Sequence, residues 1–225
     1  MTTIDVCFVT WPITHERIAA FHKCVTEWTE RLTCDSGDVI GWYCSTETGG
    51  CTKDQLDTVR DICVDHEITL HERQETPDQG SNLNVAMRMC DADFLIMVMD
   101  DFHLAGDLNV SPHCRFLTEH PDVSTVRYGW ISSTFTGDIE GTDLQWVNMK
   151  GGYPYATAPS LWRANWEEEF GPWEENKGYC KPENHRNHQM IVSGRPIACT
   201  RFNFGKWDGT KSTREHRMDG LPLRT

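Results

Sequence analysis

The chain has 225 residues, of which 38% are hydrophobic and 24% are charged. This composition is typical of a globular protein with one sizeable core, and it excludes a disordered chain. No apolar run approaches the roughly 20 residues of a membrane-spanning helix, and the first residues lack a secretory signal. We therefore expect a soluble cytoplasmic protein whose ten cysteines are free thiols.

The formal net charge of −13 is unevenly distributed along the chain. Residues 176–225 contain ten Lys and Arg but only four Asp and Glu, so the first 175 residues carry a charge of −19. A basic segment attached to an acidic body either contacts an anionic partner or docks on the body itself.

Strand and helix patterns alternate through the first hundred residues. The expected strands are residues 4–11, 39–44, 67–71 and 94–99, and the expected helices are residues 14–32, a helix beginning at Thr52, and residues 84–90. This alternation predicts an α/β fold with a mostly parallel central sheet and helices on both faces.

The second half of the chain is less regular. The expected elements are strands at residues 123–128, 144–149 and 153–162, an acidic aromatic turn at 167–175, and a helix at 183–193 that Gly194 ends. Because no repeat or linker interrupts the sequence, we expect a single domain, 1–225, composed of two halves, 1–104 and 105–225.

Residues 95–104 read LIMVMDDFHL, an apolar strand that runs directly into Asp100, Asp101 and His103. Two adjacent carboxylates repel each other unless a cation or a solvated turn relieves them. The segment is therefore either an ordinary polar turn or a site for a divalent metal. Ligands of parallel sheets bind at the carboxyl ends of the strands, and this position favours a site.

The run QGSNLNVAMRMCDADFLIMVMDDFH, residues 79–103, resembles the core of the GT-A glycosyltransferases. The matching positions before the acids are Asn84, Ala86, Cys90, Ala92, Asp93 and Phe94. The first strand and the residues Thr10, Trp11 and Pro12 that follow resemble the family's nucleotide-binding start. The resemblance covers the first hundred or so residues well and the remainder loosely.

The resemblance implies a GT-A type fold and metal-dependent transfer of a sugar from a nucleotide sugar, with a UDP-sugar as the expected donor. Asp101-Phe102-His103 departs from the common Asp-any-Asp motif, but it is similar to a variant within the family. Asp101 and His103 are then the expected ligands of Mn²⁺ (or Mg²⁺), and imidazole favours Mn²⁺. The family often adds a C-terminal histidine as a ligand. Here the candidate is His216, which is otherwise an exposed residue of the tail.

The resemblance also implies a donor site in the first half, 1–104. Its expected residues are Thr10, Trp11, Pro12, Ser45, Glu47, Asn84 and Asp100. Asp100 is expected to contact the ribose or the sugar, and for this reason it also counts as a catalytic residue.

An inverting transfer needs a carboxylate that takes the proton of the acceptor hydroxyl. Glu183 is the candidate base, with Glu174 and Glu175 as rivals, and a helix-capping acid is the alternative role. The alignment with the family is ambiguous by one position. If Asn184 occupies the base position, the transfer can retain configuration instead.

The second half, 105–225, is expected to bind the acceptor. Trp162, Arg163 and Trp173 are the expected wall of that site. The proposed acceptor is a 5-hydroxymethylpyrimidine in DNA, by analogy with compact viral members of the family, and its phosphates would be contacted by Arg186, Arg195 and Arg201. The alternative acceptors are an oligosaccharide, a lipid-linked sugar and a protein. The alternative functions are a nucleotidylyltransferase and a non-catalytic module that binds nucleic acid or carbohydrate.

Overall fold

The computed structural model describes residues 1–74, 77–129, 134–151, 153–177 and 181–207. The alternation predicted for the first hundred residues is present in it. The main elements of this part are β1 (Thr3–Thr10), α1 (His15–Arg31), β3 (Val39–Glu47), α2 (Lys53–Asp65), β4 (Thr69–Arg73), α3 (Gln79–Arg88) and β5 (Phe94–Met99).

Local sequence signals set the starts of the first two helices. The Thr14 side chain caps α1 by accepting a hydrogen bond from the backbone N–H of Arg17 at 3.3 Å. Thr52 and Gln55 form a reciprocal capping box at the start of α2. Such caps satisfy backbone N–H groups that have no partner within the helix, and they fix where each helix begins.

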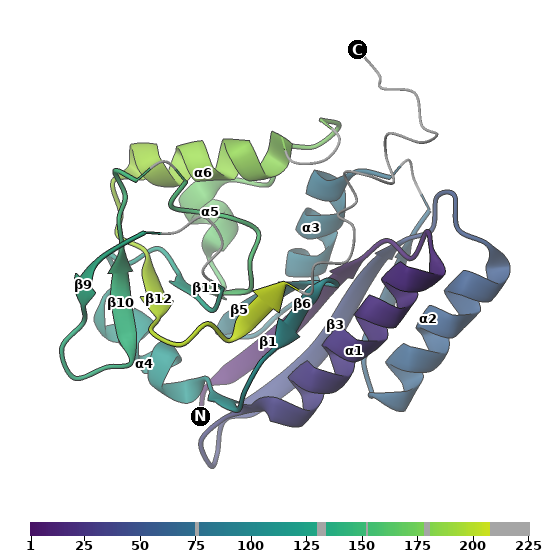
Figure 1. The fold of residues 1–225 in the computed structure, drawn as a ribbon, viewed down its shortest axis with the longest axis horizontal. Helices are drawn as coiled ribbons and strands as arrows, with labels where there is room; N and C mark the ends of the chain where they lie inside the picture. Colours follow the sequence, from purple (N-terminus) through teal and green to yellow (C-terminus); the bar gives the residue numbers. More distant parts are fainter. Residues whose placement is uncertain (75–76, 130–133, 152, 178–180, 208–225) are drawn as a thin grey trace.

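One nine-stranded sheet organises the molecule, with the strand order β4-β3-β1-β5-β11-β8-β12-β10-β9 (Figure 1). The first four strands of this order pair in parallel. The strands from the second half are β8 (Val126–Arg127), β9 (Phe135–Asp138), β10 (Leu144–Val147), β11 (Ser160–Arg163) and β12 (Ala198–Thr200). They pair antiparallel except for β8 with β12, so the sheet is mixed, with its parallel part on the side that ends in β4.

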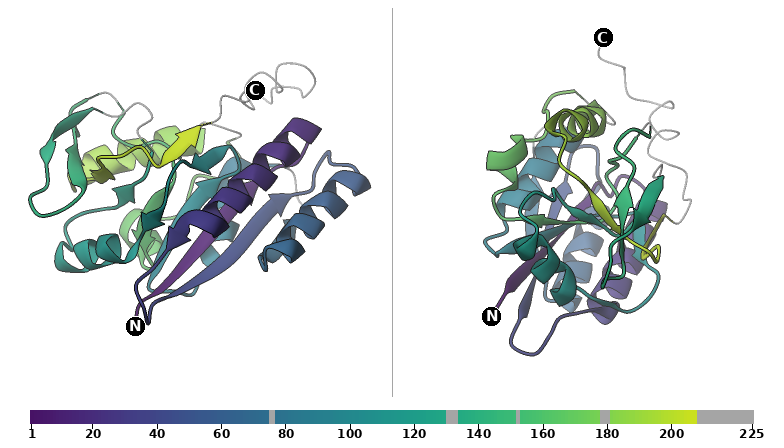
Figure 2. Two further views of the ribbon diagram at one scale, coloured as in Figure 1. Left: turned by 60° about the horizontal axis from the view of Figure 1, so that its bottom comes forward. Right: turned by 90° about the vertical axis from the view of Figure 1, so that its left-hand side faces the viewer.

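Helices cover both faces of the sheet, as predicted. Val6 and Phe8 of β1 pack on one side with α1, α2 and α4 (Ser111–Glu119), whereas Cys7 and Val9 pack on the other. The helices of that second side are α3, α5 (Trp166–Phe170) and α6 (Lys181–Ser193) (Figure 2). Successive residues of a strand point to opposite faces, which is why β1 contributes to two apolar clusters.

The short strands place further segments beside the end of β5. β6 (Phe102–Leu104) follows β5 after a two-residue turn and pairs antiparallel with β13 (Gly205–Trp207). β2 (Leu32–Thr33) pairs with β7 (Leu108–Asn109). Residues close to the C-terminal end of the described chain therefore lie next to His103.

Several predicted boundaries were wrong. Helix α3 begins at Gln79 rather than at residue 84, because the Asp78 side chain caps it through the backbone N–H of Ser81 at 2.9 Å. In the segment 153–162 only the last residues form a strand, β11, and the expected turn at 167–175 begins within α5. Helix α4 was missed. None of the helices in the described ranges combines the length and hydropathy of a membrane span.

Candidate functional site

Asp100 follows β5 directly, and its side chain is completely buried. One carboxylate oxygen accepts hydrogen bonds from Thr10 Oγ1 at 2.7 Å and from the Trp11 backbone N–H at 3.4 Å, and the other contacts Nη2 of Arg17. These partners belong to the end of β1 and the first turn of α1. Asp100 therefore fastens the β1–α1 connection to the end of β5, a geometry that favours positioning over the expected contact with the ribose.

Asp101 and His103 lie in a different environment from Asp100. The Asp101 side chain is 17% exposed, and its Oδ2 lies 3.8 Å from Nη1 of Arg17. The His103 side chain is 6% exposed, and its Nδ1 lies 3.5 Å from Oε2 of Glu27 on α1. A partly exposed carboxylate and an imidazole two residues apart offer the oxygen and nitrogen donors that Mn²⁺ accepts.

Asp101 and His103 suit a metal ion that a bound nucleotide would also coordinate. No group of three or more His, Cys, Asp or Glu side chains that could hold a metal is present among the described residues. Phosphate oxygens and water are further ligands that a cation at Asp101 and His103 could take, as hard divalent cations do at nucleotide sites. His216, the expected third ligand, lies outside the described residues.

Helix α1 packs against this motif and donates hydrogen bonds to its backbone. Trp28 Nε1 and Cys24 Sγ both donate to the backbone carbonyl of Phe102 at 3.0 Å. Burial, and then the charges of Asp100 and Asp101, raise the pKa of the Cys24 thiol well above its usual value. The thiol is therefore neutral near pH 7 and remains a donor, so that two donors of α1 hold the one carbonyl between Asp101 and His103.

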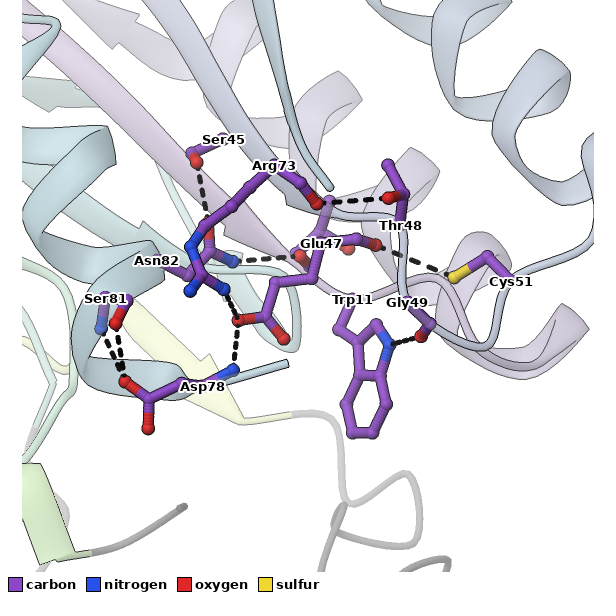
Figure 3. Close-up of polar contacts among 11 residues, drawn as sticks. Trp11, Ser45, Glu47, Thr48, Gly49, Cys51, Arg73, Asp78, Ser81 and Asn82 are labelled. Atoms are coloured by element: carbon purple, nitrogen blue, oxygen red, sulfur yellow. Dashed lines mark hydrogen bonds and ion pairs between the residues drawn. The ribbon is translucent and has the colours of Figure 1, made fainter. Parts of the chain in front are cut away.

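The ends of β1 and β3 carry several residues of the expected donor site (Figure 3). Ser45 Oγ donates to Asn82 Oδ1 at 2.6 Å, and Asn82 Nδ2 donates to the Thr10 carbonyl at 3.1 Å. The Trp11 indole N–H donates to the Gly49 carbonyl at 2.8 Å. Thr10, Trp11, Pro12 and Ser45 are all buried, and the structure brings these predicted residues together at one edge of the sheet.

Glu47 extends this region toward β4. Its side chain is buried, and Oε1 accepts from Arg73 Nη1 at 3.1 Å and from the Asp78 backbone N–H at 2.6 Å (Figure 3). Asp78 is itself the cap of α3. Glu47 therefore links the ends of β3 and β4 to the start of α3 beside the predicted nucleotide site.

Asn84 does not lie with the other predicted donor residues in these contacts. It is completely buried, and its side-chain amide exchanges hydrogen bonds with the Trp173 backbone, accepting from N–H at 2.7 Å and donating to the carbonyl at 3.0 Å. It also donates to Glu175 Oε1 at 2.7 Å. Beside it, a Cβ added at Gly80 would lie 2.0 Å from the Glu174 carbonyl oxygen. This part of α3 is a packing contact with the segment 173–175.

The candidate base Glu183 lies in the first turn of α6 and is partly buried. Its Oε1 lies 2.9 Å from the Tyr153 hydroxyl, and its Oε2 accepts from the Thr157 backbone N–H at 3.0 Å and from the Thr157 hydroxyl. The Tyr153 hydroxyl also lies 2.7 Å from Oδ1 of Asn184. Two residues of the segment 153–157 therefore fix the direction of the Glu183 carboxylate.

The register of the sheet relates Glu183 to the acids at the end of β5. Ser160, at the start of β11, pairs with Met97 near the end of β5. Because the two strands are antiparallel, the chain before Ser160, including Thr157, lies toward the carboxyl end of β5. Glu183, Asp100 and Asp101 therefore belong to the same edge of the sheet.

The residues expected to line the acceptor site are mostly internal. Trp162 and Trp173 are each 1% exposed, and both contact the ring of Tyr155. Arg186 is buried with its guanidinium 4.6 Å from the centre of the Trp173 ring, and burial lowers its pKa to about 10. Burial places these side chains in the apolar core rather than on an acceptor-facing wall.

The other three predicted arginines differ in exposure. Arg163 donates to the backbone carbonyls of Leu117, His120 and Val123, and Arg195 pairs with Glu169 and donates to the carbonyls of Pro121 and Asp122. Arg201 is exposed, and its side chain contacts Asp138 and Thr142. Of the three predicted phosphate contacts, Arg201 is the one with an exposed side chain.

Sequence analysis missed Arg17, Asn82, Tyr153 and Thr157, although each contacts a predicted site residue. A signal existed for Arg17: it stands three residues after the helix cap Thr14, in the first turn of the helix that leaves β1. That turn lies at the carboxyl end of the strand, where α/β proteins bind ligands. The expected helix began only at residue 84, which hid the position of Asn82 on α3.

Comparison with known proteins shows the fold. No protein-family model matches the sequence, and a search of curated sequences found no significant match. Among solved structures, residues 1–349 of TarS from S. aureus match over 90% of this chain with a TM-score of 0.61 and 11% identity. The mannosyltransferase PcManGT from Pyrobaculum calidifontis, in complex with GDP-Man and Mn²⁺, matches over 96% with a TM-score of 0.62 and 11% identity.

A third structure, CMP:2-keto-3-deoxy-manno-octonic acid synthetase in complex with CTP, matches over 96% of this chain with a TM-score of 0.56 and 9% identity. The chain covers 97% of that synthetase but only 59% of the TarS fragment and of the mannosyltransferase. Identities this low carry the architecture alone. The chain has a GT-A-like α/β fold.

Proposed function

We propose that the chain is a metal-dependent glycosyltransferase that moves a sugar from a nucleotide sugar to an acceptor hydroxyl. The observation that carries this proposal is the position of Asp101 and His103. They follow the central parallel strand β5, beside the polar cluster formed by the ends of β1 and β3. That edge is where an α/β sheet binds a nucleotide, and the two side chains are suitable donors for a divalent cation.

The solved structures support the proposal through what they contain. The structure of the mannosyltransferase is a complex with GDP-Man and Mn²⁺, and a crystal structure of the TarS fragment is a complex with UDP. Both align with nine-tenths or more of this chain. A nucleotide-sugar donor and Mn²⁺ are accordingly the donor and cofactor that we propose, with a UDP-sugar as the first choice.

In the proposed reaction the acceptor oxygen bonds to the anomeric carbon, and the bond from that carbon to the diphosphate breaks. The nucleoside diphosphate leaves with the bonding electrons, and Glu183 takes the proton of the acceptor hydroxyl. A divalent metal bound at Asp101 and His103 would stabilise charge on the departing diphosphate. Tyr153 and Thr157 hold the Glu183 carboxylate in one orientation, which suits a base that must face the acceptor.

The test is a screen of UDP-, GDP- and CMP-sugars for hydrolysis with and without Mn²⁺, followed by a panel of acceptors. We expect hydrolysis of one donor class that requires Mn²⁺ and stops with a chelator. The configuration of the transferred sugar then reports the base: inversion supports Glu183, and retention supports Asn184 in that position. Absence of metal-dependent hydrolysis and of donor binding for every sugar would favour a non-catalytic binding module.

A second candidate is a nucleotidylyltransferase, which joins a nucleoside triphosphate to a sugar and releases pyrophosphate. It is favoured by the synthetase bound to CTP, because this chain covers nearly all of that protein. The first turn of α1 also supplies Arg17 close to the end of β1. Release of pyrophosphate from a triphosphate and a sugar distinguishes this reaction from glycosyl transfer, which releases a nucleoside diphosphate.

For the acceptor we propose a 5-hydroxymethylpyrimidine in DNA, with an oligosaccharide, a lipid-linked sugar and a protein hydroxyl as the competing outcomes of the acceptor panel. Support comes from the basic composition of residues 176–225. The internal contacts of Arg186 and Arg195 reduce that support, because neither side chain lies free on the surface.

A further inference from the structure

We propose that Arg17 is a positioning residue that acts as the built-in counter-cation of Asp100 and Asp101 and opposes metal binding while the nucleotide is absent. The inference rests on the proposed function, because it concerns the metal and nucleotide of that same site. It assigns a role to a side chain that the reaction itself does not use.

The contacts of Arg17 lead to this role. Arg17 is 5% exposed, Nη2 contacts Oδ1 of Asp100, and Nη1 lies 3.8 Å from Oδ2 of Asp101. One planar guanidinium thus lies against both carboxylates. The fork of N–H groups gives arginine a fixed geometry toward carboxylates that lysine lacks.

The two carboxylates differ in how firmly they are held. Asp100 is fully buried and also accepts from Thr10 and from the Trp11 backbone, whereas Asp101 is partly exposed and lies farther from the guanidinium. Asp100 therefore stays with Arg17, and Asp101 is the carboxylate that remains accessible to a cation. Arg17 thus gives the two acids different roles: Asp100 holds the β1–α1 connection, and Asp101 is the proposed metal ligand.

The charges around Asp101 determine how strongly the motif attracts a cation. Among the described side chains, the carboxylates of Asp100 and Asp101 lie against the Arg17 guanidinium, and the carboxylate of Glu27 lies beside His103, so negative charge gathers at the motif. A divalent cation attracted to this charge is also repelled by Arg17 at close range. The diphosphate of a nucleotide adds negative charge, so metal and nucleotide favour each other's binding.

The experiment measures Mn²⁺ binding by electron paramagnetic resonance of the free ion, first without nucleotide and then with saturating UDP or GDP. Arg17→Met keeps an unbranched, flexible side chain and removes the guanidinium with its charge. We expect this variant to bind Mn²⁺ alone about tenfold more tightly than the wild type, and the enhancement by nucleotide to fall by a similar factor. Arg17→Lys restores a positive charge and should bind Mn²⁺ nearly as the wild type does.

Two further variants separate charge from folding. Lys23→Met removes an exposed positive charge from the same helix and should leave Mn²⁺ binding unchanged. If Arg17→Met alone does not fold, Arg17→Met combined with Asp100→Asn removes a balanced pair, and Mn²⁺ binding without nucleotide should match the wild type. Equal Mn²⁺ affinity in the wild type and Arg17→Met, or tenfold tighter binding in the balanced variant, would overturn the role.

The same titrations distinguish the two proposals. If Arg17→Met binds Mn²⁺ more tightly but neither UDP, GDP nor CMP binds any variant, the proposed function fails and the opposition between Arg17 and the metal stands. If nucleotides bind with Mn²⁺ and the Arg17 variants behave like the wild type, the proposed function stands and the role of Arg17 is lost.

Discussion

Asp100 and Asp101 are adjacent in the sequence, yet the fold gives them different surroundings. Asp100 accepts hydrogen bonds inside the protein, and Asp101 keeps part of its carboxylate exposed. The pattern of an apolar strand followed by two acids predicted a special site at the strand end. It could not predict which acid is buried, because that depends on Thr10 and Arg17, which lie more than eighty residues earlier in the chain.

Replacement of Asp101 tests the proposed metal site at the level of one residue. Asp101→Ala should abolish Mn²⁺-dependent donor binding and lower turnover by at least about 100-fold, because the carboxylate ligand is lost. The melting temperature should change little, since the side chain is partly exposed. Asp107→Ala, an exposed acid shortly after the motif, is the matched control. Near-normal activity of Asp101→Ala would remove Asp101 from the metal site.

Two acids close to the start of β5, Asp5 and Asp93, should give opposite pH dependences of stability. Burial raises the pKa of Asp5, so its ionisation in the folded state is unfavourable. The contribution of Asp5 to the unfolding free energy of the wild type is complete below the pKa of the unfolded state, about 4. It is lost as the pH rises through the pKa of the folded state. Asp5→Asn should therefore gain in unfolding free energy relative to the wild type as the pH rises.

Asp93 supplies the matched control for Asp5. Hydrogen bonds from the backbone and side chain of Thr3 lower its pKa, so its contribution is present above the unfolded pKa and is lost as the pH falls through the folded pKa. Asp93→Asn should be less stable than the wild type near pH 7, and the difference should vanish in acid. Urea titrations at a series of pH values measure both slopes, and slopes of the same sign would contradict the assignments.

At the level of elements, the sequence predicted the parallel half of the fold well. Strand β5 is a continuous apolar run, β1 is apolar from Val6 to Val9, and α1 and α2 carry their own caps. The expected strand at residues 123–128 contains β8, but the two-residue extent of β8 was not predicted, and β12 was not predicted at all. Each has only two or three residues, and distant pairing rather than local pattern defines it. For the same reason the burial of Trp162 and Arg186 was not visible in the sequence.

Helix α3 offers a pair of asparagines with different expected roles. Asn84→Ala should cost about 1–3 kcal/mol of stability, because the Trp173 backbone loses both of its hydrogen bonds to the side chain. Its donor Kd should remain that of the wild type. Asn82 lies two residues earlier on the helix. Asn82→Ala should weaken donor binding, because the Asn82 side chain hydrogen-bonds both Thr10 and Ser45. Donor titrations and chemical unfolding of both variants decide between these roles.

At the level of the whole molecule, the distribution of charge bears on the acceptor. The first 175 residues carry −19, so a polyanion is repelled by most of the protein and can approach only at a basic region. Sequence counting located that region in residues 176–225 but could not separate surface charges from internal ones. Arg186 lies among aromatic rings, and Arg195 joins Glu169 to backbone carbonyls, whereas Arg201 is exposed.

Salt dependence tests the DNA acceptor at this scale. If DNA is the acceptor, transfer to it should fall steeply as salt rises, because binding releases counterions from the phosphates. Hydrolysis of the donor should change much less, since short-range contacts hold the diphosphate and are poorly screened. Arg201→Ala should reduce the salt slope for DNA by about one unit, the loss expected for one phosphate contact.

Arg88→Ala is the control for this experiment, because Arg88 is as exposed as Arg201 but lies on α3 and pairs with Glu167. Its salt slope should equal that of the wild type, since a charge outside the basic segment contributes no phosphate contact. If transfer to a neutral oligosaccharide showed the same salt dependence as transfer to DNA, salt would be acting on donor binding or on the fold. Together with an absence of transfer to hydroxymethylated DNA, that result would direct the search toward an uncharged acceptor, to which the basic segment contributes nothing by counterion release.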